Sequence, residues 1–275
     1  MSEGDLPEST SWNDSLANMP EEAVPSTYLN HIQNLPQAQP FELSFTIVRA
    51  VNLATAPLTG ATWLGEQLRG YIGHELGKRF EHVPEEDIEE PDPSVAGPAA
   101  EGMQHNLHRE EIRELYLNLL AASMSKSSAL TAHPSYAYII RQISPDEAKI
   151  LEHTSGDEME GYPIAELRLK RNQSYSYKPL VQDYSLLPRQ AGCNHPELTV
   201  NYINNLERLR IIRIRRDSRL TEEGVYDELE TLLREGVAKN FGHASEEVDL
   251  KKGHTHLTLF GKVFVDTCTG NPTEE

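Results

Sequence analysis

Six arginines lie within twelve residues in the second half of the chain, and they form its densest group of one chemical type. Guanidinium groups bind phosphates and carboxylates through paired hydrogen bonds, so this segment suits either a nucleic-acid backbone or acidic protein groups. Because the chain carries a large excess of acids, pairing within the chain or with a protein partner is the favoured interpretation, and nucleic-acid contact is the alternative. The segment contains Arg208, Arg210, Arg213, Arg215, Arg216 and Arg219, with the single acid Asp217 among them.

Two pairs of residues have spacings that also occur in catalytic sites. Ser123 and Lys126 form a Ser-x-x-Lys pair, but the further motifs that accompany such serine nucleophiles are missing from the sequence. Asp146 and Glu147 are neighbouring carboxylates, and their place after Ser144 and Pro145 suits the first turn of a helix. No glycine-rich segment has the Gly-Lys-Ser/Thr ending of a phosphate loop. We therefore predict that the protein is not an enzyme and binds no cofactor.

The histidines could supply metal ligands, but their spacing falls short of a metal site. His105, His108 and Glu111 could converge on one face of a helix. His254 and His256 would point to one side of a strand. Neither set has the convergent ligands that a zinc site normally shows, so we predict solvated histidines and no bound metal.

The negative charge is concentrated in two runs. The net charge is -18, yet residues 1–42 and 81–92 each hold seven acids and no Lys or Arg, which leaves -4 for the rest of the chain. Such runs keep a protein soluble and repel nucleic acid, and the first run could mask the arginine segment. The first run also contains apolar residues at helical spacing, which could form a short helix. These are Tyr28, Leu29, Ile32 and Leu35.

The remaining composition points to an intracellular setting. No stretch approaches the roughly 18 apolar residues that a membrane span needs. Residues 1–16 lack the positive start and apolar run of a secretory signal. Cys193 and Cys268 are far apart and have no CxxC partner, which indicates two free thiols rather than a disulfide framework. We predict a cytoplasmic protein without a membrane span.

Composition and periodicity divide the chain into three parts. Residues 1–40 lack a sustained apolar period, so we predict an acidic, disordered tail. Residues 41–155 form a predicted helical domain, interrupted by an acidic, proline-rich linker at 81–98. Residues 156–275 mix strand and helix patterns and form a predicted smaller α+β domain. The fold class is therefore mainly α, with a helical bundle-like N-terminal half and a winged-helix-like C-terminal part.

The clearest periodic signal predicts a helix over residues 63–80. Its apolar residues recur every four positions and form one slowly drifting stripe, which favours packing in a core. Two other interpretations remain open for this helix: self-association and contact with a membrane surface. The stripe consists of Leu64, Leu68, Ile72, Leu76 and Phe80.

Local patterns also place elements around the arginines. Ser144, Pro145 and Glu147 fit the cap, first position and third position of a helix with a capping box. Residues 210–215 have the order Arg-Ile-Ile-Arg-Ile-Arg, which changes toward alternation and predicts a strand, and residues 251–257 predict a return strand. A helix follows the return strand. The order of helix, strand, insertion, strand and helix underlies the winged-helix-like prediction.

Three stretches together resemble the abortive-infection alpha family of bacterial proteins. They are residues 114–124, residues 133–151 and residues 257–265, the last with Cys268 close behind and residues 206–212 before it. The resemblance covers roughly residues 60–268 and implies a bacterial protein of anti-phage abortive infection. It brings no catalytic or cofactor residues.

Two positions within the resemblance bear on the local backbone. The resemblance implies that Gly261 turns the chain. It also implies a glycine where this chain has Arg210, directly before a pair of isoleucines.

These observations support two functional hypotheses. The first is a non-enzymatic abortive-infection protein that acts by contact with an unidentified protein partner, or by self-association through the helix at 63–80. The second is a nucleic-acid-binding regulator that uses the segment from Arg208 to Arg219.

Overall fold

The computed structural model describes residues 45–55, 63–155, 161–170, 177–237, 240, 242 and 248–270. The predicted tail at 1–40 lies outside these residues. The chain divides into two compact units, the first ending at Arg141 and the second running from Gln142 to Gly270. The mainly α composition is confirmed, with the sheet confined to the second unit.

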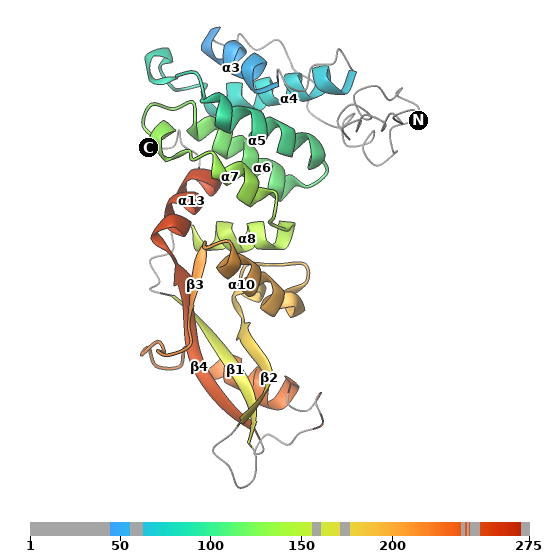
Figure 1. The fold of residues 1–275 in the computed structure, drawn as a ribbon, viewed down its shortest axis with the longest axis vertical. Helices are drawn as coiled ribbons and strands as arrows, with labels where there is room; N and C mark the ends of the chain where they lie inside the picture. The colour runs from blue at the N-terminus through green and yellow to red at the C-terminus, as the bar shows by residue number, and fades with distance from the viewer. Residues whose placement is uncertain are drawn as a thin grey trace, which may run out of the picture. The chain divides into compact units, whose positions relative to one another are not determined.

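The first unit is built from helices. They are α3 (Phe45–Thr55), α4 (Trp63–Arg79), α5 (Pro93–His105), α6 (Glu110–Ala122) and α7 (Ser135–Ile140), with short 3-10 turns η3 (Glu85–Asp87) and η4 (Ala129–Thr131). Helix α5 contacts α3, α6 and α7 and so lies at the centre of the unit (Figure 1). Leu115, Leu119 and Leu120 of α6 are buried, as the helical spacing of its apolar residues requires.

The stripe on α4 is used inside the first unit. Leu68, Ile72, Leu76 and Phe80 are all at most 4% exposed, while the side chain of Leu64 lies outside the described residues. The predicted helix is therefore confirmed. Burial of this apolar row supplies the stabilisation that a helix containing several glycines requires.

The predicted acidic linker at 81–98 is too long, because α5 begins inside it. Pro93 occupies a position in the first turn, where its missing N–H costs nothing, and the Asp92 carboxylate accepts the Ser94 N–H at 2.7 Å. Residues 81–92 are also bound to the unit. The Glu89 N–H donates to the Met124 carbonyl, and Ile88 is buried.

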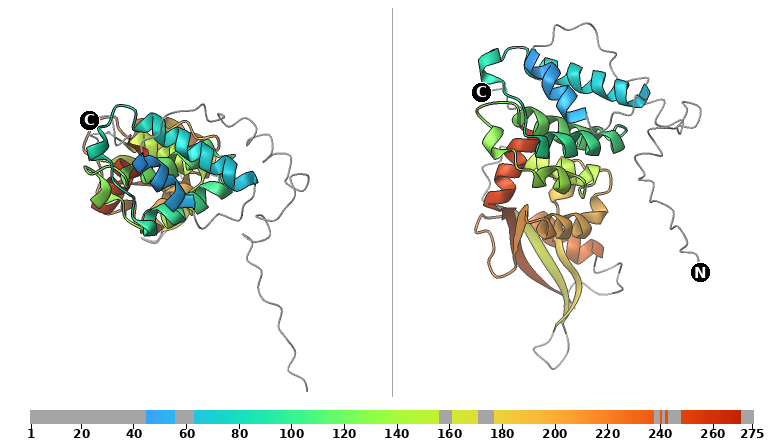
Figure 2. Two further views of the ribbon diagram at one scale, coloured as in Figure 1. Left: turned by 90° about the horizontal axis from the view of Figure 1, so that it is seen from above. Right: turned by 45° about the horizontal axis from the view of Figure 1, so that its top comes forward.

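The second unit combines a four-stranded antiparallel sheet with helices. Its elements are α8 (Pro145–Thr154), β1 (Tyr162–Lys170), β2 (Tyr177–Ser185), α9 (Leu187–Gln190), η5 (Pro196–Leu198), α10 (Thr199–Arg208), β3 (Ile212–Arg215), α11 (Asp227–Thr231), the π-helical η6 (Leu232–Val237), β4 (Val248–Leu257) and α13 (Leu259–Thr269). The strand order is β2-β1-β4-β3, and Figures 1 and 2 show the strands side by side in a curled sheet. The predicted strands at 210–215 and 251–257 correspond to β3 and β4.

The two faces of the sheet have different surroundings. On one face, Ala165, Leu167 and Val248 pack with Leu229 and Leu233 of the α11–η6 segment. The opposite face of the paired strands β1 and β4 carries charged pairs in register, such as Glu166 opposite Lys251. Strands β1 and β2 pair antiparallel within this sheet, and the winged-helix-like arrangement stays a prediction.

Helix α8 belongs to the second unit, whereas the sequence-based division at 155/156 placed it with the preceding helices. Contacts of its first turn with the loop at 193–195 and with α10 explain this assignment. Such contacts join residues about fifty positions apart, so local periodicity does not reveal them.

Gly261 does not turn the chain, contrary to the sequence-based expectation. It lies in the first turn of α13, where its N–H donates to the Thr258 hydroxyl that caps the helix, at 2.8 Å. A Cβ atom at this position would overlap the carbonyl oxygen of Ile211. Glycine is therefore required for the close approach of α13 to the segment that enters β3.

Replacement of Gly261 by Ala should destabilise the second unit, because a backbone carbonyl has to move to admit the methyl group. We expect a loss of about 1–3 kcal/mol in the free energy of unfolding, measured by urea denaturation. Gly236→Ala is the matched control, since a Cβ atom there meets nothing within 4 Å. Equal stability of the two variants would contradict this packing argument.

Candidate functional site

The first turn of α8 forms a fully bonded capping box. The Ser144 hydroxyl accepts the Glu147 N–H at 3.3 Å, and the Glu147 carboxylate accepts the Ser144 N–H at 2.8 Å and its hydroxyl at 2.7 Å. The second oxygen of Glu147 accepts the Asn205 side-chain amide at 2.7 Å. Glu147 is 4% exposed, so the capping prediction is confirmed and both of its oxygens are occupied.

Asp146 joins the same turn to a distant loop and to α10. Its carboxylate accepts the N–H groups of Asn194 and His195 at 2.8 and 2.9 Å and the Tyr202 hydroxyl at 2.8 Å. Burial acts to raise the pKa of Asp146, but these three donors stabilise the carboxylate, and the pKa lies below its usual value. An ionised, fully bonded carboxylate holds structure and does not suit proton transfer.

The other residue pairs with catalytic spacing are also separated or committed. The Ser123 hydroxyl donates to the Leu120 carbonyl, and the Lys126 ammonium donates to the Glu86 carbonyl, so the two side chains do not bond each other. The Cys193 thiol donates to the Asp146 carbonyl, and burial, aided by the charge of Asp146, raises its pKa to about 11. At neutral pH this cysteine is a thiol and not a nucleophilic thiolate.

The histidine patterns have different outcomes. Helix α5 ends at His105 and α6 begins at Glu110. The three residues His105, His108 and Glu111 therefore do not lie on one helix, although their spacing would have allowed it. His254 and His256 do lie on one side of β4, with ring centroids 5.7 Å apart. Within the described ranges, no group of three or more His, Cys, Asp or Glu side chains is arranged to hold a metal ion.

Three of the six arginines are bound within the second unit. Arg208 donates to the side chains of Asn205 and Gln142, and Arg215 pairs with Asp217 at 3.1 Å. Arg216 is held by Asp183. Among the residues that the structure describes, no ion pair involves Arg210, Arg213 or Arg219, and all three are exposed. The segment is therefore partly structural and partly an open basic surface.

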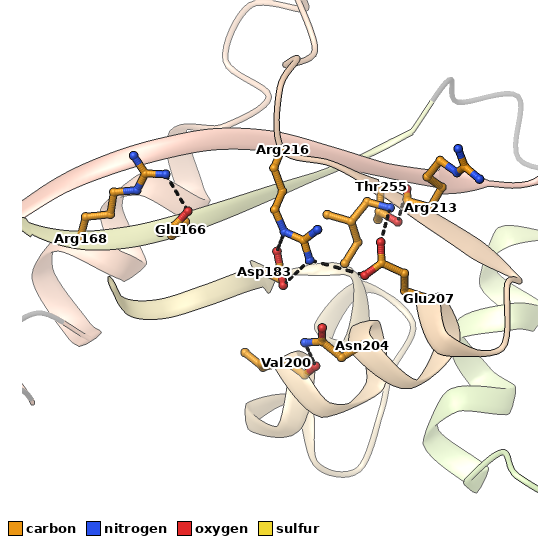
Figure 3. Close-up of polar contacts among 10 residues, drawn as sticks. Glu166, Arg168, Asp183, Val200, Asn204, Glu207, Arg213, Arg216 and Thr255 are labelled. Atoms are coloured by element: carbon orange, nitrogen blue, oxygen red, sulfur yellow. Dashed lines mark hydrogen bonds and ion pairs between the residues drawn. The ribbon is translucent and has the colours of Figure 1, made fainter. Parts of the chain in front are cut away.

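Arg216 is the most strongly bound arginine of the segment (Figure 3). Its Nε and Nη2 atoms donate to the two Asp183 carboxylate oxygens at 2.8 Å each. Nη2 also donates to Glu207 at 3.4 Å. The other Glu207 oxygen accepts the N–H of Ile214 at 3.2 Å. This junction ties β2, α10 and the edge strand β3 together, and Figure 3 shows Arg213 pointing away from it.

Asp183 is held in an unusual backbone conformation. Its φ is 56°, in the left-handed region, beside an irregularity in the β1–β2 register, and its side chain is buried. Asp tolerates this region better than most residues because of its short polar side chain. Neither Asp183 nor Glu207 was expected as an arginine partner, since nothing in local spacing links residue 183 to residue 216.

Arg210 takes the place of a glycine at the end of α10. Its φ is 64°, its N–H donates to the Glu207 carbonyl, and the Ile211 N–H donates to the Leu206 carbonyl. These two bonds are those of a Schellman motif, in which the left-handed residue is usually glycine. The glycine that the family resemblance implies at this position is therefore explained by backbone conformation.

The edge of the sheet carries a cluster that we call the basic face: Arg213, Arg215, His254 and His256. Arg213 lies opposite His256 and Arg215 opposite His254 in the β3–β4 register, so all four side chains share one face. Ile212 and Ile214 are buried on the other face. The Nδ1 atom of His256 is buried and has no hydrogen-bond partner among the described residues.

The electrostatic environment of the basic face is positive. Burial lowers the pKa of His256, and the positive charges of His254, Arg215 and Arg213 lower it further. Asp217 is the only acid paired with an arginine of this face among the described residues. The face is therefore arranged to attract a negatively charged group.

A polar hollow of about 350 Å³ lies along the loop that follows β3, next to this region. Its Tyr226 hydroxyl donates to the Gly253 carbonyl at 2.6 Å and accepts the Leu220 N–H, and its Lys252 pairs with Glu230 at 2.9 Å. These polar groups hold the loop against the sheet. The hollow is therefore a structural feature beside the basic face.

Replacement of Arg210 by Gly should stabilise the second unit, because glycine adopts the left-handed conformation without strain. We expect a gain of about 1 kcal/mol in the free energy of unfolding, measured by urea denaturation. The control is Arg208→Gly, which places glycine in the last helical turn of α10 and should lower the stability. A loss of stability in both variants would contradict the capping role of position 210.

Replacement of Asp183 by Asn should destabilise the second unit by about 1–2 kcal/mol, because it removes the carboxylate charge and one of the two oxygens that accept from Arg216 at a buried position. Asn keeps the tolerance for the left-handed backbone, so the measured loss reports the ion pair. Asp217→Asn removes the exposed pair with Arg215 and should leave thermal unfolding close to that of the parent protein. Similar effects of the two variants would refute the central role of Arg216.

No helix within the described ranges is both long enough and apolar enough to span a membrane. The search of curated proteins gave no match. The search of solved structures gave none either. The model of the family described as "Abortive infection alpha" matches residues 66–268, which is most of the chain, and the protein therefore belongs to the abortive-infection alpha family.

Proposed function

We propose that this abortive-infection protein is not an enzyme and protects bacteria against phage by contact with a protein partner in the cytoplasm. The observation that carries the proposal is the state of its acidic groups. Asp146 and Glu147, which lie in a segment typical of the family, have their oxygens bonded to groups of the second unit. The residues with catalytic spacing thus serve the scaffold, and a basic surface remains exposed.

The surface next to the basic face has the composition of a protein interface. The Thr258 hydroxyl donates to the Arg210 carbonyl at 2.7 Å, so the start of α13 lies beside the exposed arginines. Leu259 is 88% exposed and Val263 40%, one helical turn apart on α13. Arginines beside exposed apolar anchors are typical of protein-binding surfaces.

Self-association through α4 is a second form of the same proposal. Its apolar stripe is buried inside the first unit, so a second copy would meet other positions of the helix. Gly70 offers such a position, since a Cβ atom there meets nothing within 4 Å. Light scattering of the purified protein tests this form, and a monomer at all concentrations would refute it.

Nucleic-acid binding is the second candidate function. The favouring observation is that Arg210, Arg213 and Arg219 are exposed and form no ion pair with the described residues. In the winged-helix-like prediction, β3 and β4 would form the wing that meets a phosphate backbone. The chain's net charge of -18 opposes this candidate, because a polyanion is repelled at long range.

A capture experiment from infected bacteria distinguishes these functions. We expect tagged protein to retain a phage or host protein, and Arg213→Glu with Leu259→Asp to lose both that protein and phage protection. The control is Lys178→Glu with Leu130→Asp, which makes the same changes at exposed positions elsewhere. Protection that survives the first double variant would refute contact through this surface.

The nucleic-acid candidate has its own readout. Binding of labelled DNA or RNA to the purified protein, titrated with salt, should weaken steeply if phosphates meet the arginines. No binding at low salt, or binding unchanged when Arg213, Arg215 and Arg216 become Ala, would end that candidate.

A further inference from the structure

We propose that the acidic N-terminal segment of the chain, residues 1–42, docks on the basic face of the second unit and covers it. The occupant is this chain's own segment. The inference goes beyond the proposed function, because it concerns what occupies the surface before any partner arrives.

The basic face provides a specific receptor for carboxylates. Its two arginines and two histidines lie in two opposite pairs, with Arg213 facing His256 and Arg215 facing His254 across the β3–β4 ladder. Opposite side chains in an antiparallel ladder are about 5 Å apart, so one carboxylate can contact both members of a pair. Arg213 is exposed and has no ion-pair partner within the described ranges. The Arg213–His256 pair therefore has bonding capacity left for an acid at Arg213, while Arg215 already pairs with Asp217.

The boundaries of the face extend this receptor. The Ser218 carbonyl lies 3.3 Å from the Nδ1 atom of His254, which places the loop carrying the exposed Arg219 on one side. On the other side, the bond from the Thr258 hydroxyl to the Arg210 carbonyl places exposed Leu259 at the border. An occupant that combines carboxylates with a few apolar side chains fits this surface best.

Residues 1–42 have that combination. They hold seven acids and no Lys or Arg, so every ionised side chain in them is attracted to the basic face. They also supply apolar side chains at helical spacing that can meet Leu259 and Val263 of α13. These are Tyr28, Leu29, Ile32 and Leu35.

The second acidic run is a weaker candidate because it is already bound elsewhere. Residues 81–92 are fixed to the first unit by the Glu89 N–H, by the Lys126 N–H that donates to the Asp87 carbonyl, and by buried Ile88. Two acids near the end of this run have partners of their own: Glu90 pairs with Arg49 at 2.7 Å, and Asp92 caps α5. The backbone of this run is therefore held within the first unit.

The acidic segment is tethered to the protein by the chain that leads into α3. The 44 residues that precede α3 can span up to about 145 Å when extended, at roughly 3.3 Å per residue. A tethered ligand of this kind acts at an effective concentration on the order of millimolar, so weak ion pairs suffice to populate the docked state. Exposed ion pairs are also screened, with a Debye length of about 8 Å at physiological salt. The contact should therefore loosen as salt is added.

Protonation of His256 strengthens docking. Without an acid, His256 faces Arg213 and Arg215 from β3 and His254 from its own strand, all of which disfavour its charged form, while Asp217 pairs with Arg215. Carboxylates on the face reverse this balance and raise the pKa of His256. Because the docked state then binds the proton more tightly, docking is favoured at low pH and weakens as pH rises through the higher, docked pKa.

Paramagnetic relaxation in the full-length protein tests the docking directly. A nitroxide is attached at Ser9→Cys in a Cys193→Ser background, where the remaining Cys268 is fully buried and its pKa is raised. We expect the side-chain signals of His254 and His256 to be lost at low salt and to return at high salt. Retained histidine signals at low salt would overturn the proposal.

Three comparisons make the result specific. Neutralising the seven acids of residues 1–42 to amides, or replacing Arg213 by Glu, should restore the histidine signals and lower the pKa of His256, while Lys178→Glu should change neither. Signals that stay lost in the neutralised chain would overturn the proposal. Nitroxide-labelled protein mixed with an isotope-labelled copy that lacks the nitroxide separates docking within one chain from docking between copies. Histidine signals that are lost only through contact between copies would overturn docking within one chain.

The outcome is independent of the proposed function. If the histidine signals respond as expected but no partner is captured, docking stands and protein contact falls. If a partner is captured and the histidine signals never change, protein contact stands and docking falls. Gain of oligonucleotide binding in the neutralised chain would show that the segment excludes nucleic acid from the same surface, which supports covering of the face.

Discussion

The second unit depends on the rule that a buried carboxylate needs a full set of donors. Asp146 and Glu147 are 5% and 4% exposed, and removing an ionised group from water without partners costs several kcal/mol. The donors come from Ser144 in the same turn, from the loop at Asn194, and from Asn205 and Tyr202 of α10. A local capping box thus becomes a connection between distant segments, and it fixes α10 against α8.

The same rule decides which arginines remain available. Helix α10 carries Glu207, which reaches the edge strand through the Ile214 N–H and also contacts Arg216. Asp183, buried at a register irregularity of β2, takes the rest of the Arg216 charge. One arginine therefore compensates the buried acid. Arg213, on the outer face of β3, compensates no buried acid. It stays exposed and charges an edge strand that would otherwise pair with a further strand.

Sequence reasoning succeeded where the governing contacts are local. The capping box at Ser144 spans four residues, the stripe of α4 repeats every four, and the alternation at 210–215 has the period of a strand, so each can be predicted without tertiary information. The predicted linker at 81–98 is wrong at its C-terminal end. Pro93 begins α5, because proline is favoured in the first turn of a helix. The pairing of Arg216 with Asp183, and of Asp146 with Tyr202, joins residues 33 and 56 positions apart. No short-range pattern encodes such distances.

Gly261 and position 210 show how the family resemblance and the structure inform each other. Both positions concern the approach of α13 to the end of α10: Gly261 leaves space for the Ile211 carbonyl, and residue 210 turns left-handed so that Ile211 can enter β3. These requirements concern the backbone. The basic face, by contrast, consists of the side chains of residues such as Arg213 and His256, which do not take part in this backbone packing. Substitutions on the basic face therefore change what the surface attracts without changing how the surface is held. Under the proposed function, the scaffold holds the surface, and the side chains at the edge of the sheet determine what the surface binds.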